Sequence, residues 1–455
     1  MHTMTCSVPG MGQTSAGKEP RHETLASEYM SGQWSPHAFV LSHDGQRCLV
    51  HRRDGFELIS PGGRTEVKAD VLRNRSRECF WSPDSQKVLM WAPQTNHYLY
   101  KRVAVLDTSK LAPGTVIDTI ATREANAPWE VIYDAGQAHK VEGPREDKEV
   151  VAPEPYGFEW APPGDAVFVL ERLYFKHDPQ RESETRILRV DLPERRITEL
   201  VRMSGEIDFF MPPVSRFEHG QGPSRRPYRI VFGHREGLFL LDPRPARQAA
   251  EPRWRRIHDL PAQGLKNVEW NPGQGPDQLL LYFKTQGLVT AANTVRGVAL
   301  VHLEQVGRGE GWLEQLYDGD DEVHTLWFSP HGAWATWATS TFAAYRRPAP
   351  EAGPPVRIVC RDEDGRVLPV KGLHWHADER HLAITAGARL FVHDAQKGET
   401  RQVARLGEDD ERDFLAEPRW VGDKVYLSRF EDVRDEAKAW REVPHLHLPP
   451  RRRGN

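Results

Sequence analysis

The chain has 455 residues, of which 28% are charged and 38% are hydrophobic, and its formal net charge is −4. This balance is typical of a soluble globular protein, and it excludes a bulk electrostatic attraction to nucleic acid or to anionic membranes. The length exceeds what a single hydrophobic core needs, so the chain contains either several domains or an array of repeats.

Nothing in the sequence resembles an export or membrane signal. The first ten residues lack both the basic region and the apolar core of a secretory signal. No apolar run approaches the roughly 20 residues that a membrane helix needs. The cysteines, Cys6, Cys48, Cys79 and Cys360, are scattered without a C-x-x-C spacing, which favours free thiols in a reducing compartment. We therefore expect a cytoplasmic protein without a membrane partner.

The N-terminal region contains few structural signals. Residues 1–20 are rich in Met, Gly, Ser and Thr without periodicity, and we predict a disordered leader there. Thr24 to Met30 then reads as a short strand, but no hairpin partner lies nearby in the sequence.

A repeated turn motif begins near residue 39. At Phe80 to Met90, a Pro-Asp-Ser turn separates two apolar runs, a pattern that predicts a short β-hairpin. Weaker copies follow a large residue in other parts of the chain. The gap between Trp160 and Trp270 is about twice the others, so we add Phe210 as a further anchor. The eight anchors are Leu41, Trp81, Trp160, Phe210, Trp270, Phe328, Trp375 and Trp420.

Except for the 79 residues between Trp81 and Trp160, neighbouring anchors lie 40 to 60 residues apart, and each unit carries several short strands. Such a period is typical of four-stranded propeller blades. The 36 glycines and 35 prolines recur throughout and exclude long helices. We predict an all-β β-propeller of eight blades, as a single domain over residues 21–446 before a basic tail at 447–455. The strand near Thr24 to Met30 would complete the last blade and close the ring, which removes exposed sheet edges. Seven blades are the alternative, if the final strands merge with the first unit.

The turn at Trp81 to Ser85 resembles the Ser-Pro-Asp-Gly turn of WD40-like propeller repeats of the TolB type. Leu41 to Gly45 and Phe328 to Gly332 resemble it less closely, and the resemblance covers roughly residues 35–445. Related propeller domains occur in prolyl-oligopeptidase-type peptidases. The resemblance implies a propeller fold but no substrate, because the motif is architectural.

Two segments exceed the length that a blade needs, residues 110–156 and the proline-rich residues 342–356. Loops that project from a rigid propeller are where such proteins usually bind partners. Trp334 and Trp337, three residues apart, are expected on opposite faces of a strand, with one exposed as a binding anchor. The candidate partner-binding residues are Trp334, Trp337, Tyr345, Arg346 and Arg347.

Catalytic motifs are absent from the sequence. There is no G-x-S-x-G elbow, no further tract for a hydrolase domain and no P-loop. The alternation of His374 and His376 places both on one side of a predicted strand. Together with His324 and His381 they form a candidate metal site. This arrangement of histidines resembles the metal site of some propeller lyases. We predict no catalytic residue and no cofactor.

We therefore predict a non-catalytic cytoplasmic scaffold that mediates protein–protein interaction in a larger complex, with a protein partner and no nucleic acid. The alternative is a propeller enzyme, a metal-assisted lyase or hydrolase with His324, His374 and His376 at a central channel. A third possibility is a sensor that binds a small ligand in that channel.

Overall fold

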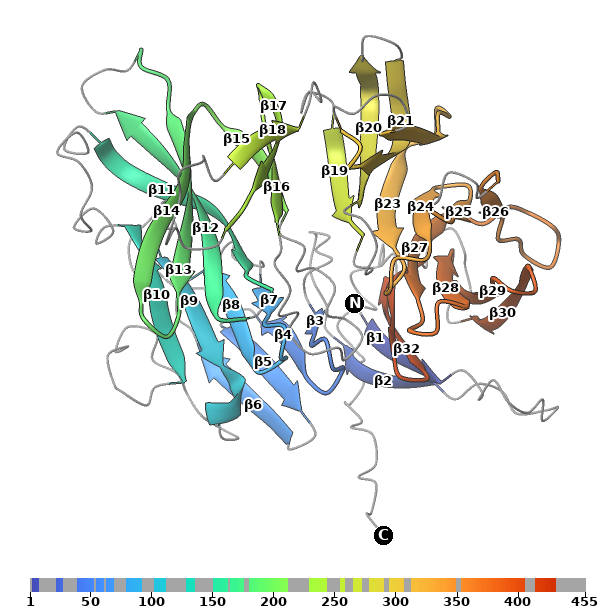
Figure 1. Ribbon diagram of the computed structural model, residues 1–455. Coiled ribbons are helices and arrows are strands. Elements are labelled where there is room, and N and C mark those ends of the chain that lie inside the picture. The colour runs from blue at the N-terminus through green and yellow to red at the C-terminus, as the bar shows by residue number, and fades with distance from the viewer. Residues whose placement is uncertain are drawn as a thin grey trace. The chain divides into compact units, whose positions relative to one another are not determined.

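A computed structural model gives the fold of the chain (Figure 1). It describes residues 2–7, 22–27, 39–52, 55–60, 63–68, 79–91, 102–111, 128–135, 150–162, 164–175, 180–211, 229–243, 254–257, 265–271, 278–289, 294–306, 312–348, 353–405 and 414–430. The chain divides into two compact units, one formed by Ser35–Gln263 and the other by Met1–Trp34 with Gly264–Asn455.

The unit Ser35–Gln263 contains four sheets, each of four antiparallel strands in sequence order. We name each blade by its strands. The first two blades consist of β3 (Phe39–Leu41), β4 (Cys48–Arg52), β5 (Gly55–Ser60) and β6 (Gly63–Lys68), then β7 (Cys79–Trp81), β8 (Lys87–Trp91), β9 (Arg102–Asp107) and β10 (Trp129–Asp134). A single 3₁₀ turn, η1 (Thr108–Lys110), follows β9. The next two consist of β11 (Val150–Trp160), β12 (Ala166–Phe175), β13 (Glu184–Asp191) and β14 (Arg196–Ser204), then β15 (Ile207–Met211), β16 (Ile230–His234), β17 (Gly237–Leu241) and β18 (Trp254–Ile257).

The other unit also contains four four-stranded sheets. Three of them follow the sequence order: β19 (Leu265–Trp270), β20 (Gln278–Val289), β21 (Thr294–His302) and β22 (Leu313–Tyr317); β23 (Val323–Phe328), β24 (Ala335–Thr339), β25 (Ala343–Arg346) and β26 (Val356–Ile358); β27 (Val370–Trp375), β28 (His381–Ala386), β29 (Arg389–Asp394) and β30 (Glu399–Arg405). The fourth sheet joins the two ends of the chain in the order β31 (Phe414–Val421), β32 (Lys424–Phe430), β1 (His2–Ser7) and β2 (His22–Ser27).

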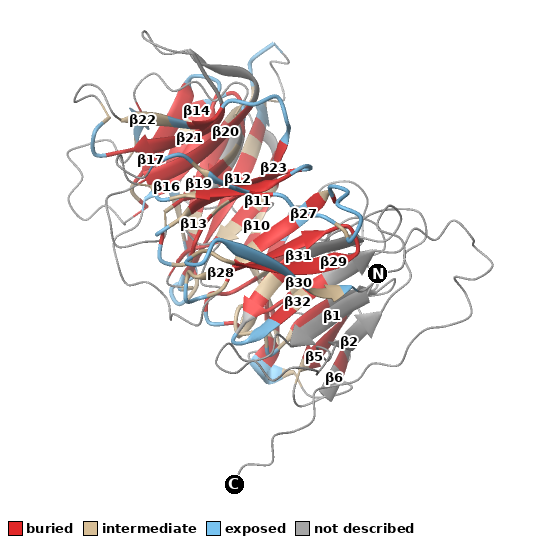
Figure 2. Ribbon diagram, turned by 90° about the vertical axis from the view of Figure 1, so that its right-hand side faces the viewer, coloured by how far each residue is buried: buried red, intermediate tan, exposed pale blue. Residues whose placement is uncertain are grey.

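The middle strands of the blades are largely buried. Every residue of β16, β17, β24 and β28 is buried, whereas five of the seven residues of the outer strand β30 are exposed (Figure 2). A strand buried on both faces cannot show the apolar–polar alternation of a half-exposed strand. These strands therefore read as short continuous apolar runs in the sequence.

The hydrophobic cores lie between consecutive blades of a unit. Between β3–β6 and β7–β10, for example, Leu49 and Leu58 pack with Trp81 and Val88. Tryptophan side chains add hydrogen bonds across these interfaces. Trp81 Nε1 donates to the Val40 carbonyl oxygen, and Trp160 Nε1 donates to the Phe80 carbonyl oxygen, both at 2.9 Å. The anchor residue of one blade is thereby bonded to the first strand of the blade before it.

The prediction of an all-β β-propeller is confirmed, since the described strands form successive four-stranded antiparallel blades. Each predicted anchor lies in the first strand of one sheet. The prediction of a single ring of eight blades is corrected, because the sheets divide between two compact units with four in each. Sequence spacing alone does not show where the chain divides into two units.

The expected roles of the N-terminal segments are also corrected. Residues 2–7, placed in the predicted disordered leader, form β1, which pairs with β32 from His2–Arg429 to Ser7–Lys424. The strand expected near Thr24 to Met30 is β2, which pairs with β1 and not with the C-terminal strands. The predicted pairing of the two chain ends is therefore present, but a different strand makes it. The composition of residues 1–20 concealed one short strand because polar threonines alternate with small and apolar residues there.

The two predicted insertions contain blade strands. Within residues 110–156, Trp129–Asp134 is β10, the fourth strand of its blade, and Val150 begins β11. Within residues 342–356, Ala343–Arg346 is β25 and pairs with β26, which begins at Val356. Prolines after Arg347 masked the short buried strand that precedes them. The predicted tail at 447–455 lies outside the described residues. Across the described part of the chain, no helix is long and apolar enough to cross a membrane.

Candidate functional site

The turn that joins the first two strands of a blade is built from its own serine and aspartate. In blade β7–β10, Ser82 Oγ donates to Asp84 Oδ1 at 2.5 Å and accepts the Lys87 backbone N–H at 2.8 Å. Asp84 Oδ1 also accepts the Gln86 backbone N–H at 3.0 Å. Ser85 takes the left-handed conformation that closes the turn, with φ 58°. The Ser-Pro-Asp-Ser sequence is therefore a structural turn, as the resemblance implied.

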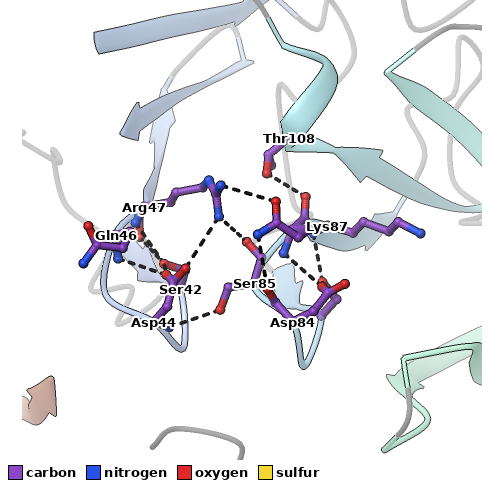
Figure 3. A network of polar contacts seen from close by, with 10 residues as sticks. Ser42, Asp44, Gln46, Arg47, Asp84, Ser85, Lys87 and Thr108 are labelled. Carbon is purple, nitrogen blue, oxygen red and sulfur yellow. Dashed lines mark hydrogen bonds and ion pairs between the residues drawn. The ribbon is translucent and has the colours of Figure 1, made fainter. Parts of the chain in front are cut away.

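Consecutive turns are bonded to one another (Figure 3). In blade β3–β6, Ser42 and Asp44 repeat the bonds of Ser82 and Asp84. Arg47, at the end of this turn, donates from Nη1 to the Ser85 carbonyl oxygen at 2.7 Å. The Asp44 backbone N–H donates to Ser85 Oγ at 3.1 Å. The left-handed residue of one turn thus accepts two hydrogen bonds from the preceding blade.

The turn of blade β23–β26 lacks the aspartate, because His331 stands in its place. Its role is taken by Glu379 from the next blade. Glu379 Oε1 accepts hydrogen bonds from Ser329 Oγ at 2.5 Å and from the backbone N–H groups of His331 at 2.6 Å and Ala333 at 3.3 Å. Glu379 has φ 52° and occupies the same turn position as Ser85. Trp334 Nε1 donates to the Glu379 carbonyl oxygen at 2.9 Å, as Arg47 does to Ser85.

The turn of blade β27–β30 brings two histidines to one carboxylate. His376 and His381 stand where the turns of blades β3–β6 and β7–β10 have a serine and a basic residue. His376 Nδ1 lies 3.0 Å from Asp378 Oδ1, and His381 Nδ1 lies 2.7 Å from Asp378 Oδ2. One ligand atom of each residue lies within 4.8 Å of the others, so this group is a candidate metal centre. We name it the His–Asp–His turn.

The surroundings of the His–Asp–His turn keep Asp378 ionised. Partial burial opposes its charge, but the backbone N–H groups of Arg380 and His381 and the two imidazoles lower its pKa to about 2. The Arg380 guanidinium forms a bidentate pair with Asp394, at 3.0 and 2.6 Å. The Trp420 ring packs on the His376 imidazole with their centroids 4.9 Å apart. Side-chain exposures of 17% for His376, 35% for Asp378 and 10% for His381 leave a path from solvent.

The three histidines proposed from the sequence lie in different environments. His376 belongs to the His–Asp–His turn, together with His381. His374 lies on β27, before the turn, and its Nδ1 accepts the Trp420 backbone N–H at 3.2 Å. His324 is exposed on β23, and its Nδ1 lies 2.9 Å from Thr325 Oγ1. In the described part of the chain, only His376 of these three joins a group with metal-ligand spacing. Asp378 was missed because it was treated as a turn residue only.

The proposed partner-binding residues are mostly inside the blade. Trp337 and Tyr345 are 1% and 2% exposed, and Trp334 is half-buried and stacks on Trp375. Arg346 pairs with Glu314 at 2.5 Å and is only 11% exposed in its side chain. Arg347 is exposed and lies over the Trp334 ring, 5.1 Å from its centroid. Neither tryptophan of the pair is therefore exposed, although one of them was expected to be. Trp337 lies on β24, whereas Trp334 precedes that strand.

The exposed apolar side chains of this blade lie further along the chain. Among the described residues, the exposed large hydrophobic side chains are Tyr174, Val356, Val359 and Val367. Three of these four fall within twelve residues at the outer edge of blade β23–β26. Val356 begins the edge strand β26, and Val359 and Val367 flank a hairpin that follows it. We name this surface, Val356, Val359 and Val367, the valine edge.

The hairpin at the valine edge is fixed by its own hydrogen bonds. Asp362 Oδ1 accepts the backbone N–H groups of Asp364 at 3.0 Å and Arg366 at 2.7 Å, while Gly365 has φ 81°. Leu368 N–H donates to the Cys360 carbonyl oxygen at 2.9 Å, and both side chains are buried. The alternation of buried and exposed residues puts Val359, Arg361 and Val367 on the solvent side. The Asp-Gly pair of this hairpin was the sequence signal that could have found it.

A buried polar network lies between blades β7–β10 and β11–β14. Glu171 has no exposed surface, and its carboxylate contacts the Tyr133 hydroxyl and the Arg186 guanidinium. Arg186 also lies 3.4 Å from Glu199. Burial raises the pKa of Glu171, although Arg186 and Tyr133 oppose this rise. These buried residues connect β10 with β12 and β13, and we assign them a structural role.

Comparison with known proteins places the chain only by fold. No known family profile matches it, and no curated protein matches it either. Solved structures that resemble it include a eukaryotic initiation factor, with 11% identity over 85% of this chain and 81% of that chain at a TM-score of 0.47. An oligogalacturonate lyase in complex with manganese has 12% identity over 88% and 89% at 0.39. The Cps50 (Swd1) β-propeller domain of Myceliophteria thermophila has 11% identity over 77% and 95% at 0.36.

At these identities and TM-scores the likenesses assign no role to the chain. The resemblance to TolB-type repeats stays a prediction, since no family profile matches. The functional proposal therefore depends on the features of this chain alone. It provides a rigid apolar edge, which suits contact with a protein, and one cluster of imidazole and carboxylate donors, which suits a cation.

Proposed function

We propose that this chain is a non-catalytic protein-interaction platform that binds its partner at the valine edge. The observation that carries this proposal is the exposure of Val356, Val359 and Val367, at 44%, 41% and 38%, on one blade margin. Exposed apolar side chains scattered singly need no explanation, but a cluster of them favours a contact surface.

Rigidity of the valine edge supports the same proposal. Glu363, in the hairpin loop, pairs with Arg389 of the next blade at 2.5 Å, and Arg389 also donates to Gln402 Oε1 at 3.0 Å. Arg389 is 3% exposed, so the hairpin is tied to a buried group. A partner that binds a preformed hairpin avoids the free-energy cost of ordering a loop.

The position of β26 gives the partner a second means of contact. β26 is the last strand of its sheet, and its other side pairs with β25 through Tyr345–Val356 and Ala344–Arg357. An edge strand presents backbone groups that an extended segment of another chain can pair with. We infer a partner with an extended apolar segment, which would bury the valines and pair with this edge.

The alternative enzyme needs His324, His374 and His376 in one site. Among the described residues, His374 is engaged with Trp420 and His324 with Thr325, so the contacts favour the platform over that enzyme. The cytoplasmic location and the absence of a nucleic-acid partner remain predictions from composition and charge.

The proposal is tested by affinity isolation from the native cell with the full chain as bait. The variant carries Val359→Ser and Val367→Ser, and the matched control carries Tyr174→Ser, which removes an equally exposed apolar side chain from another blade. We expect a defined, stoichiometric partner with the wild type and the control, and its loss with the double variant. Equal recovery with all three baits, or no partner with the wild type, would overturn the proposal.

A further inference from the structure

Comparison of the turns within this chain shows that the two imidazoles of the His–Asp–His turn are not needed to build it. In blade β7–β10, the serine hydroxyl both donates to Asp84 and accepts the Lys87 N–H. In blade β27–β30, Asp378 Oδ1 alone accepts the N–H groups of Arg380 at 2.9 Å and His381 at 3.1 Å. The same backbone hydrogen bond closes both turns. The N–H of Ser82 donates to the Lys87 carbonyl oxygen, and the N–H of His376 donates to the His381 carbonyl oxygen, each at 2.8 Å.

The two imidazoles approach different oxygens of the same carboxylate. His376 Nδ1 lies 3.0 Å from Asp378 Oδ1 and 3.3 Å from the Asp378 backbone nitrogen, and His381 Nδ1 lies 2.7 Å from Asp378 Oδ2. An imidazole nitrogen can donate to a carboxylate when it carries a proton, and it can bind a metal ion when it does not.

We propose that His376, Asp378 and His381 bind a divalent transition-metal ion, with Zn²⁺ as the best fit. Two imidazole nitrogens and one carboxylate oxygen form a donor set that zinc uses in sites with an open fourth position. Around tetrahedral zinc, bonds of roughly 2.0–2.2 Å place the donor atoms about 3.3 Å apart. The donor atoms here lie within 4.8 Å of one another, so closure needs only side-chain adjustment.

Neighbouring groups hold the ligands in place. The Trp420 ring fixes the His376 imidazole from the adjacent blade. His381 Nε2 lies 3.8 Å from Asp394 Oδ2, on the ring side away from Asp378. A carboxylate near the far nitrogen orients a metal-binding histidine. Because Arg380 is paired with Asp394, its charge is directed away from the proposed ion. The ion would brace the turn, against which the Trp420 ring of β31 packs.

Isothermal titration calorimetry with ZnCl₂ on the EDTA-treated full chain tests this proposal. We expect one saturable site in the wild type that is lost in His376→Ala with His381→Ala. Loss of a ligand should weaken binding by more than the roughly 10- to 100-fold that loss of an outer-shell partner costs. His331→Ala, which removes an exposed histidine from the neighbouring turn, is the matched control and should leave the site unchanged.

Two further measurements keep the result clear if a variant fails to fold. Circular dichroism checks the fold of each variant, and titration of the wild type with Co²⁺ reports imidazole ligation through its visible spectrum. Zinc binding that survives unchanged in the folded double variant would overturn the proposal. So would the absence of saturable Zn²⁺ binding and of a Co²⁺ spectrum in the wild type.

Discussion

Glu379 Oε1 accepts the hydroxyl hydrogen bond of Ser329, 50 residues earlier in the chain and one blade away, at 2.5 Å. In blade β7–β10 the same bond is made within the turn, from Ser82 to Asp84. The aspartate that is missing at His331 is therefore supplied by the following blade. The serine hydrogen bond that lies within one turn in blade β7–β10 therefore connects two blades here.

This relationship predicts that Glu379→Ala destabilises the protein. The change leaves Ser329 Oγ and the N–H groups of His331 and Ala333 without their acceptor, and we expect a loss of about 1–3 kcal/mol in the free energy of unfolding. Glu379→Gln keeps an acceptor oxygen in place and should lose less. Urea denaturation of the three proteins measures the difference, and equal stabilities would contradict the assignment.

A second change should restore the bond within the turn. His331→Asp places a carboxylate at the position of Asp84, so it should recover part of the stability lost in Glu379→Ala. In the wild-type background the same change brings two carboxylates together and should be neutral or destabilising. A double-mutant cycle on urea denaturation gives the coupling energy, which should be favourable only when Glu379 is absent.

The tryptophan bonds between blades give a prediction with an internal control. Trp160 and Trp337 are each 1% exposed, but Trp160 Nε1 donates to the Phe80 carbonyl oxygen, whereas Trp337 Nε1 has no partner within the described residues. Replacement by phenylalanine removes the same volume from both. Trp160→Phe should therefore cost about 0.5–1.5 kcal/mol more than Trp337→Phe, measured by denaturant unfolding. A larger loss for Trp337→Phe would show that packing, and not the indole bond, dominates.

The buried Glu171 predicts a pH dependence of stability. Burial raises its folded pKa, so folding favours the protonated form. Its contribution to stability is fully present below the unfolded pKa, and it is lost as pH rises through the folded pKa. The free energy of unfolding of the wild type, relative to Glu171→Gln, should thus fall as pH rises from about 4.5. Denaturation at a series of pH values measures this difference. A rise with pH would mean that the Arg186 ion pair outweighs burial.

Sequence reasoning located the blades because their signal is local. Each anchor, such as Trp81 or Trp375, lies at the end of a first strand or one residue before it. The turn that follows often contains Pro, Asp or Gly, which favour the backbone conformations of a turn. The division into two units and the role of His2–Ser7 depend on packing between distant segments. β1 carries no local mark of its partner β32, which lies more than 400 residues later.

The candidate sites were predicted less well, for a physical reason. Trp337 and Tyr345 look like binding residues in the sequence, because large aromatic side chains favour both interfaces and cores. Only the sheet order shows that β24 and β25 lie inside the blade. Conversely, the valine edge looks like core in the sequence, and the edge position of β26 is what exposes it. Asp378 was recognised as part of a turn, but its approach to two imidazoles is visible only in three dimensions.

Substitutions at the valine edge should leave stability intact. Val359 and Val367 are exposed, so replacing each with serine should change the free energy of unfolding by no more than about 0.5 kcal/mol. Thermal and urea unfolding of Val359→Ser with Val367→Ser measures this. A large loss would show that these side chains serve the fold, and it would remove the reason to assign them to a partner.

The most direct test of the interaction platform is site-specific photo-crosslinking in the native cell. A photoreactive amino acid is placed at Val359 in one protein and at Tyr174, the matched exposed site of another blade, in a second. The account predicts a covalent adduct with one defined protein at Val359 and none with that protein at Tyr174. No adduct at Val359, or the same adducts at both positions, would contradict it.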